Sequence, residues 1–99
     1  LRFPTAAVDG DGATGEVLVV DDFGNAVTNI PGEVLADRFG GTIGVNGHDA
    51  PVRRAYAAVE RGQRLVTVGS HGNVELAVNR GRGDEAFGVT TGEAVTLSL

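Results

Sequence analysis

The sequence predicts an all-β fold, a small closed or nearly closed antiparallel β-barrel of about seven strands with one or two short helices. Three observations favour this fold. Short runs rich in Val, Ile, Leu and Thr recur along the chain, and each is about the length of one strand. The chain holds 16 glycines, many of them between these runs, where tight turns are needed. Closure into a barrel would remove the exposed edges that so many short strands otherwise leave.

Turn-forming residues flank each apolar run, and the longer connections between runs leave room for helices. Asn46-Gly47 is a strong signal for a two-residue turn between two strands. Pro51 favours an edge position for its strand, because proline donates no ladder hydrogen bond. A short helix is predicted at 31–39, one helical turn at 57–62 and a further short helix at 84–87. Strands are predicted at 16–20, 26–30, 42–46, 50–55, 65–68, 74–78 and 94–99.

The length indicates one small domain. The 99 residues are enough for a core without disulfides. Residues 1–14, with Pro4 and several small residues, are predicted to form a linker, and residues 15–99 are predicted to form the barrel domain. The chain begins without Met, so we expect it to be a piece of a longer protein.

Composition argues against several classes of function. Cysteine is absent, so neither disulfides nor thiolate metal sites are expected. Thirteen acidic residues against eight basic ones give a net charge of −5, which argues against binding to a nucleic-acid backbone. No apolar run approaches the length of a membrane span, and the first residues lack the apolar core of a signal peptide. We therefore expect a cytoplasmic protein that binds neither nucleic acid nor membrane.

The residue types show no arrangement typical of catalysis or metal binding. His48 and His71 lie far apart in the sequence, and neither has acidic residues at metal-ligand spacing. Ser70 precedes His71, but such a pair needs an orienting acid to act as nucleophile and base. The residues therefore predict no metal site and no catalytic group in this chain.

Phe23 is a large apolar residue at the tip of a polar bend between the predicted strands at 16–20 and 26–30. If its ring tucks under the sheet it is a core residue, which is the usual place for an aromatic beside a turn. If the ring instead faces a cleft beside Asn25, the two side chains suit a purine. The base would stack on the ring, and the amide would read a donor–acceptor edge of the base. Both interpretations stay open from the residues alone.

Glu75 also has two interpretations. It stands between Val74 and Leu76, so strand alternation points its side chain away from their face. Glu75 is then either a solvent-facing strand residue or a carboxylate that receives a ligand's ammonium or ribose hydroxyls.

Three separated motifs in the sequence resemble one known family. They are Asp-Phe-Gly-Asn at 22–25 followed by Thr-Asn-Ile at 28–30, Tyr-x-x-Val-x-x-Gly at 56–62, and Gly-Ser-x-Gly-x-x-Glu-Leu-Ala-Val-Asn-x-Gly at 69–81. With these motifs the chain is similar to the C-terminal domain of the S-adenosyl-L-methionine hydroxide adenosyltransferases, which are relatives of the bacterial fluorinating and chlorinating enzymes. The resemblance runs from Gly15 over nearly all the rest of the chain.

The resemblance implies a larger enzyme that has an N-terminal α/β domain before a β-barrel domain. It implies homotrimers in which one subunit's C-terminal domain and its neighbour's N-terminal domain enclose S-adenosyl-L-methionine. Water then displaces methionine at the 5′ carbon of the adenosyl group, giving adenosine and L-methionine, with no cofactor. The Asp, Arg and His that activate the water belong to the N-terminal domain, so this chain would bind substrate without supplying a catalytic residue.

The resemblance also implies which residues bind the substrate. A carboxylate suits a sulfonium ligand that also carries an ammonium, so Glu75 makes electrostatic sense, and it favours the hydroxide-using branch over the halogenases. The sequence departs from the family at Arg82-Gly83-Asp84, where small residues are usual, and the place of His71 is often aromatic or basic. The implied residues are Phe23 and Tyr56 as walls of the nucleoside pocket, Asn25 as the partner of adenine, Ser70 and Glu75 at the methionine end, and Val78 and Asn79 beside adenine.

A second hypothesis stays open, in which the chain is a non-catalytic β-barrel module that binds a nucleoside or mediates oligomerisation. An α/β domain upstream in the same reading frame would favour the enzyme over the module.

Overall fold

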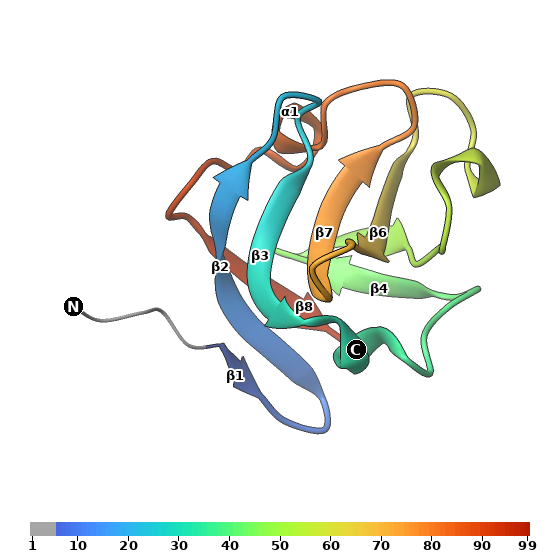
Figure 1. Ribbon diagram of the computed structural model, residues 1–99. Coiled ribbons are helices and arrows are strands. Elements are labelled where there is room, and N and C mark those ends of the chain that lie inside the picture. The colour runs from blue at the N-terminus through green and yellow to red at the C-terminus, as the bar shows by residue number, and fades with distance from the viewer. Residues whose placement is uncertain (1–5) are drawn as a thin grey trace.

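The computed structural model describes residues 6–99 (Figure 1). In this part of the chain, strands account for most of the regular structure. The strands are β1 (Ala7–Val8), β2 (Gly12–Val20), β3 (Ala26–Pro31), β4 (Thr42–Val45), β5 (His48–Pro51), β6 (Arg64–Val68), β7 (Asn73–Val78) and β8 (Ala94–Ser98). The helices are the 3₁₀ turns η1 (Gly32–Leu35) and η2 (Tyr56–Ala58) and the α-helix α1 (Gly83–Phe87).

The strands form one curved sheet in the order β5-β4-β8-β2-β3-β7-β6, with β1 beside β2. Neighbours on this path pair antiparallel. The two ends of the path meet where Val52, directly after β5, forms a parallel bridge with Val66 in β6. The backbone N–H of Arg53 adds a hydrogen bond to the carbonyl of Val66 at 3.1 Å. The predicted all-β, nearly closed antiparallel barrel is confirmed.

The turn at Asn46-Gly47 is confirmed, but the strand after it differs from the prediction. Both turn residues have positive φ, 50° and 87°, as a two-residue hairpin turn requires. Pairing therefore begins at once, with Val45 opposite His48. The strand predicted at 50–55 is wrong in its bounds, because His48 begins β5 and Pro51 ends it. The edge position predicted from Pro51 is confirmed, since β5 stands at one end of the strand order.

The predicted helices are also shorter than expected at two places. Within 31–39 only η1 is helical. Its backbone hydrogen bonds join residues three positions apart, as from the N–H of Ala36 to the carbonyl of Glu33, which is the pattern of a 3₁₀ helix. Such 3₁₀ geometry rarely runs beyond one turn. Within 57–62 only the end of η2 is helical. The helix predicted at 84–87 is confirmed as α1, and Gly88, in left-handed conformation with φ 67°, ends it.

Residues 1–14 were predicted to be a linker, and their described part differs from that prediction. Ala7 pairs with Thr14 in β2, and Gly12 pairs with Ser98 in β8. The carboxylate of Asp9 accepts the N–H groups of Asp11 and Gly12, at 2.8 and 2.9 Å, and so closes the turn between β1 and β2. The linker residues before Ala6, Pro4 among them, lie outside the described residues.

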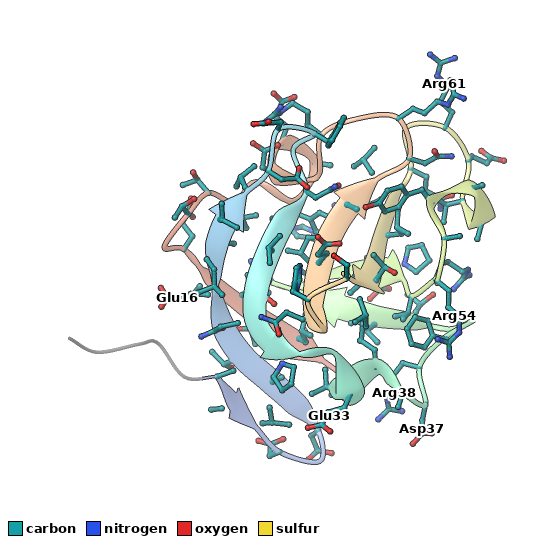
Figure 2. The ribbon with its side chains drawn as sticks, viewed as in Figure 1. Glu16, Glu33, Asp37, Arg38, Arg54 and Arg61 are labelled. Carbon is teal, nitrogen blue, oxygen red and sulfur yellow. The ribbon has the colours of Figure 1, made fainter. Side chains whose placement is uncertain are left out.

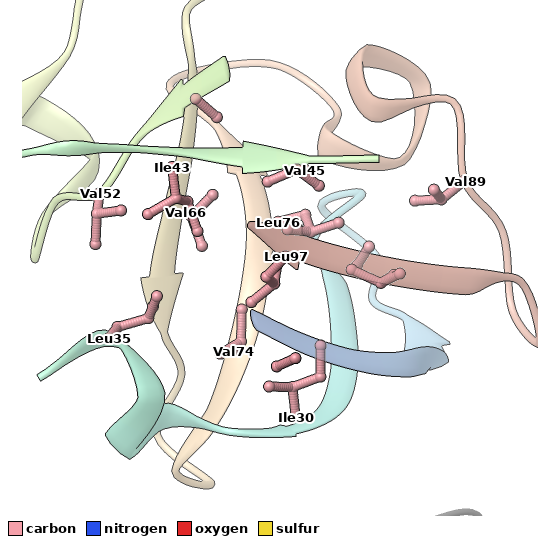
Figure 3. Packing of buried hydrophobic residues seen from close by; sticks show 14 of the residues in the cluster. Ile30, Leu35, Ile43, Val45, Val52, Val66, Val74, Leu76, Val89 and Leu97 are labelled. Atoms are coloured by element: carbon pink, nitrogen blue, oxygen red, sulfur yellow. The ribbon is translucent and has the colours of Figure 1, made fainter. Parts of the chain in front are cut away.

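The core lies inside the barrel and draws side chains from the strands around it (Figure 3). Strand β8 shows the alternation most clearly, with Val95 and Leu97 buried and their neighbours exposed. Each fully buried aliphatic side chain contributes about 1.5–3 kcal/mol relative to exposure. The largest fully buried side chains of this core include Ile30, Leu35, Leu76 and Leu97.

Thr28 and Asn29 stabilise irregular pairing on both sides of β3. The hydroxyl of Thr28 donates to the carbonyl of Val74 at 2.8 Å and accepts the N–H of Ile30 at 3.1 Å. The side-chain oxygen of Asn29 accepts the N–H of Glu16 at 2.8 Å. These side chains take the place of ladder bonds where the register shifts, so β3 can bend around the core.

One end of the barrel carries the β2–β3 turn, α1 and the loop that joins β7 to α1 (Figure 1). The N–H of Asp84 in α1 donates to the carbonyl of Gly24 in the β2–β3 turn at 2.8 Å. The N–H of Gly62 donates to the carbonyl of Asn79 at 2.7 Å and so ties the segment after η2 to the same end. Among residues 6–99 no helix has the length and apolar character needed to cross a lipid bilayer.

Candidate functional site

Asp21 organises the β2–β3 turn. Its Oδ1 accepts the backbone N–H groups of Phe23 and Asn25, both at 2.9 Å, and its Oδ2 accepts the side-chain Nδ2 of Asn25 at 3.0 Å. The backbone N–H of Asp21 in turn donates to the carbonyl of Asn25 at 3.1 Å. Gly24 has φ 84°, which only glycine adopts without strain. The turn therefore holds the ring of Phe23 and the amide of Asn25 on one rigid loop.

The ring of Phe23 is 78% exposed. The core interpretation of this residue is therefore wrong. The ring lines a hollow of about 590 Å³ together with the buried Asn25. We call this cavity the base hollow, and its lining residues are Phe23, Asn25, Tyr56, Val78, Arg80 and Gly81.

Tyr56 is the first residue of η2 and also lines the base hollow, although it lies far from the β2–β3 turn in the sequence. Burial raises the pKa of its hydroxyl, and the negative charges of Glu75 and Asp21 raise it further, while the nearby Asn25 side chain offsets part of the rise. The phenol therefore stays protonated across neutral pH and can donate or accept a hydrogen bond.

A second hollow, of about 470 Å³, adjoins the first, because Asn25 and Tyr56 line both. We call it the acid hollow, since it contains the carboxylates of Asp21 and Glu75. Ser70, on the β6–β7 turn, also lines it. Its lining residues are Asp21, Asn25, Arg54, Ala55, Tyr56, Thr67, Val68, Gly69, Ser70 and Glu75.

Glu75 is only 9% exposed, so the interpretation as a solvent-facing strand residue is wrong. The residue points away from the core as alternation requires, but the carboxylate is covered by the β6–β7 turn. The Nε2 of His71 lies 3.4 Å from its Oε1. A Cβ at Gly69 would lie 2.7 Å from the carboxyl carbon of Glu75, so a larger residue at this position would push the Glu75 carboxylate aside.

The structure brings together six of the seven residues that the sequence implies. Val78 is buried and lines the base hollow. Asn79 lines neither hollow: its Nδ2 donates to the carbonyl of Val59 at 2.9 Å, and its backbone N–H donates to Gln63 at 3.1 Å. Asn79 thus fixes the segment after η2, and with it the position of Tyr56.

Sequence reasoning gave no role to three residues at the site. Arg54 follows β5 and lines the acid hollow, with its guanidinium 3.9 Å from the ring centroid of Phe39; Figure 2 places it on the opposite side of the barrel from Glu16. Arg54 was given no role from the sequence because it falls inside the strand predicted at 50–55, whereas β5 ends at Pro51. Arg80 gave no signal, because it lies in a Gly-rich loop. Asp21 did have a recognisable signal in the sequence, because an aspartate just before a turn typically accepts hydrogen bonds from the N–H groups of that turn.

The departure at Arg82-Gly83-Asp84 has a structural explanation. A Cβ at Gly24 would lie 2.8 Å from the Cβ of Arg82, so the stem of Arg82 packs directly against the β2–β3 turn. Its guanidinium donates to Asp84 at 3.1 and 3.2 Å. These hydrogen bonds hold the pKa of the Asp84 carboxyl below its usual value. The side chain of Arg82 therefore packs on the outer side of the β2–β3 turn, the loop that carries Phe23.

Among residues 6–99 no three His, Cys, Asp or Glu side chains gather in a way that could hold a metal ion. The polar side chains that line the two hollows instead carry an amide, a phenol, two hydroxyls, two carboxylates and two guanidinium groups. Such groups can bind an organic ligand that has a flat apolar part and a cationic part.

Fold and site together define a class: an antiparallel β-barrel domain with an apolar hollow and an acidic hollow side by side at one end. Comparison with known families is specific. The model of the SAM hydroxide adenosyltransferase C-terminal domain matches residues 15–96, and the chain belongs to this family.

Several relatives are similar over nearly the whole chain. The (R)-S-adenosyl-L-methionine hydrolase of Thermus thermophilus is 42% identical over 96 residues, which make up 97% of this chain and 35% of that protein. The protein of the same name in Salinispora tropica is 35% identical over 98 residues, 99% of this chain and 37% of that protein. The chain therefore spans little more than a third of the length of the curated relatives it matches.

Solved structures share the fold. An uncharacterized conserved protein from Thermotoga maritima aligns with a TM-score of 0.87 and 33% identity, over 100% of this chain and 40% of that one. A conserved hypothetical protein from Thermus thermophilus aligns with a TM-score of 0.75 and 41% identity, over 98% of this chain and 39% of that one.

Proposed function

We propose that this chain is the substrate-binding part of an enzyme that hydrolyses S-adenosyl-L-methionine to adenosine and L-methionine. In this reaction water attacks the 5′ carbon, the new C–O bond forms as the C–S bond breaks, and the sulfur keeps the electron pair while the water loses a proton. The proposal includes the homotrimer, the N-terminal α/β domain that activates the water, and the cytoplasmic location expected from the sequence.

One observation carries the proposal: the exposed ring of Phe23 and the buried amide of Asn25 face the same hollow. A bare aromatic ring costs free energy in water unless a ligand covers it, and a purine provides a flat partner. The amide adds a hydrogen bond to the edge of the base. Val78 provides an apolar side wall, and the volume of about 590 Å³ is in the usual range for a small-molecule site.

The acid hollow supports the methionine end of the same ligand. S-adenosyl-L-methionine carries a sulfonium and an ammonium, and both cations are stabilised by a nearby carboxylate in a partly dry site. Glu75 provides such a carboxylate, and the hydroxyl of Ser70 can bond the ligand's own carboxylate. Because Asn25 and Tyr56 line both hollows, one ligand can occupy the two at once.

The test is a pair of measurements on the full-length protein. We expect adenosine and methionine to appear in equal amounts when S-adenosyl-L-methionine is added, and we expect adenosine alone to bind in calorimetry. Glu75→Gln, which keeps the shape and removes the charge, should weaken S-adenosyl-L-methionine more than adenosine. Equal weakening of both ligands, or no adenosine binding to the unaltered protein, would overturn the proposal.

The second hypothesis, a non-catalytic module, predicts a different outcome of the same assay. Adenosine would bind to the full-length protein, but methionine would not be released. Release of both products at a rate well above that in buffer would rule out the module.

A further inference from the structure

Both carboxylate oxygens of Asp21 accept hydrogen bonds from Asn25, and these contacts bear on which base the site can bind. Three donors meet the carboxylate: the N–H groups of Phe23 and Asn25 at Oδ1, and the Nδ2 of Asn25 at Oδ2. An ionised carboxylate can only accept hydrogen bonds. The amide of Asn25 must therefore turn its nitrogen, and not its oxygen, toward Asp21.

The charge on Asp21 is secured by the same contacts. Burial alone would raise the pKa of its carboxyl, but the hydrogen bonds from the backbone and side chain of Asn25 and from Phe23, with the charge of Arg82, lower the pKa below its usual value. The group is ionised at neutral pH, so the orientation of the Asn25 amide is fixed under ordinary conditions.

The Oδ1 atom of Asn25 is then the group left for a ligand. Among residues 6–99 no donor bonds this oxygen, and in the same part of the chain no fully buried side-chain nitrogen or oxygen lacks a partner. Asn25 Oδ1 is therefore open to solvent or ligand, on a residue that lines the base hollow. The site presents a fixed acceptor to an incoming base.

We propose that Asp21 is a positioning residue that sets the hydrogen-bond polarity of the base hollow and so selects a 6-aminopurine over a 6-oxopurine. The inference rests on the proposed function, in which the base hollow takes a purine. A 6-amino group donates to Asn25 Oδ1, whereas a 6-oxo group would set two acceptors against each other. The Nδ2 has two N–H groups and spends one on Asp21, so the other can donate to a ring nitrogen of the same base or to the hydroxyl of Tyr56, whose pKa the Asn25 side chain lowers.

Asp21→Asn tests this directly, because the two side chains have the same shape. The oxygen of the new amide must still accept the N–H groups of Phe23 and Asn25, so its nitrogen takes the place of Oδ2. Two NH₂ groups cannot face each other, so the Asn25 amide must turn over and present its nitrogen to the hollow. We expect the preference for adenosine over inosine, measured by calorimetry on the full-length protein, to fall by about tenfold or more, or to reverse.

Asp22→Asn is the matched control. It makes the same chemical change one residue away, at an exposed side chain that has no hydrogen bond to residues 6–99. Its adenosine-to-inosine ratio should equal that of the unaltered protein. If Asp21→Asn weakens both nucleosides equally while the denaturant midpoint holds, Asp21 only stabilises the turn and the inference is overturned. If the unaltered protein binds neither nucleoside, the proposed function itself has failed.

A measurement without any substitution covers the case in which Asp21→Asn does not fold. Purine riboside lacks a group at position 6, so it can neither donate to Asn25 Oδ1 nor repel it. The inference predicts the affinity order adenosine, purine riboside, inosine for the unaltered protein. Inosine binding as tightly as purine riboside or more tightly would contradict a fixed acceptor in the hollow.

Discussion

The imidazole of His71 lies between the N–H of Asn73 and the carboxylate of Glu75. The N–H of Asn73 donates to Nδ1 at 3.1 Å, and Nε2 lies 3.4 Å from Oε1 of Glu75. Because Nδ1 accepts, the proton of the neutral ring must be on Nε2, where it donates to Glu75. One carboxylate oxygen is thus held by the β6–β7 turn, and no donor among residues 6–99 bonds the other, which can accept a hydrogen bond from a ligand.

The first prediction concerns this pair. His71→Leu removes the donor to Glu75, so the affinity of the full-length protein for S-adenosyl-L-methionine should fall by about three- to tenfold, while adenosine affinity stays the same. His71→Gln, which can restore an N–H, should recover part of the loss. His48→Leu is the control, since His48 is exposed and lines neither hollow. A fall in adenosine affinity of the same size would show that His71 only shapes the turn.

Phe23→Ala separates a ligand wall from a core residue. Because the ring is 78% exposed, the change should cost less than about 1 kcal/mol of unfolding free energy, as surface substitutions do. Leu97→Ala serves as the comparison: because Leu97 is fully buried, this change should lower the unfolding free energy by about 2–5 kcal/mol. Adenosine affinity should fall by about 1–3 kcal/mol, the usual worth of one stacked base. A large drop in denaturant midpoint with unchanged affinity would remove Phe23 from the site.

Asn25→Ala should weaken adenosine binding and leave the barrel folded. The loss of one buried amide partner is worth about 1–3 kcal/mol. The turn keeps the two backbone N–H bonds to Asp21 Oδ1, so circular dichroism should not change. An unaltered Michaelis constant for S-adenosyl-L-methionine together with an unaltered dissociation constant for adenosine would count against the assignment.

Stability at low pH should report the contacts of Asp21. Its pKa is lowered in the folded state relative to the ordinary value of 3.8, so its stabilising contribution is complete above that value and is lost as the pH falls through the folded-state pKa. Asp21→Asn should therefore flatten the decline in denaturant midpoint below about pH 4, and Asp22→Asn should leave the decline as it is. Parallel curves for Asp21→Asn and the unaltered protein would mean that Asp21 has the same pKa in both states.

The 99-residue chain by itself should not hydrolyse S-adenosyl-L-methionine. The resemblance assigns the water-activating residues to a domain outside it, and binding without an activated nucleophile does not lower the barrier to C–S cleavage. Adenosine release by the purified chain at a rate well above that in buffer would contradict this expectation.

Local signals in the sequence predicted much of the fold, because they depend on few residues. Asn46-Gly47 is a strong signal for a tight turn, and both of its residues have the positive φ that such a turn requires. The strand bounds near Pro51 were missed because His48 and Asp49 are polar, although the adjoining turn forces them to pair with β4. Exposed polar residues in a hairpin carry no periodic signal, so their pairing follows from the turn alone.

Six residues of the site were predicted from the sequence, but their environments were not. Burial of Glu75 depends on how the β6–β7 turn folds over it, and exposure of Phe23 depends on Asp21 holding the bend open. The first is a tertiary effect and the second is a local property of the turn, and alternation along one strand contains neither. Asn79 belongs to the motif but binds Val59 instead of facing a hollow. A motif residue can thus be needed for the loop that presents the site.

The position of the adenine ring in a crystal structure of the full-length protein with adenosine decides whether the base hollow is the nucleoside site. We expect adenine stacked on Phe23 in the base hollow, with its exocyclic amine hydrogen-bonded to Asn25 Oδ1. Adenine bound elsewhere, with the ring of Phe23 left bare, would contradict the proposed function of this hollow.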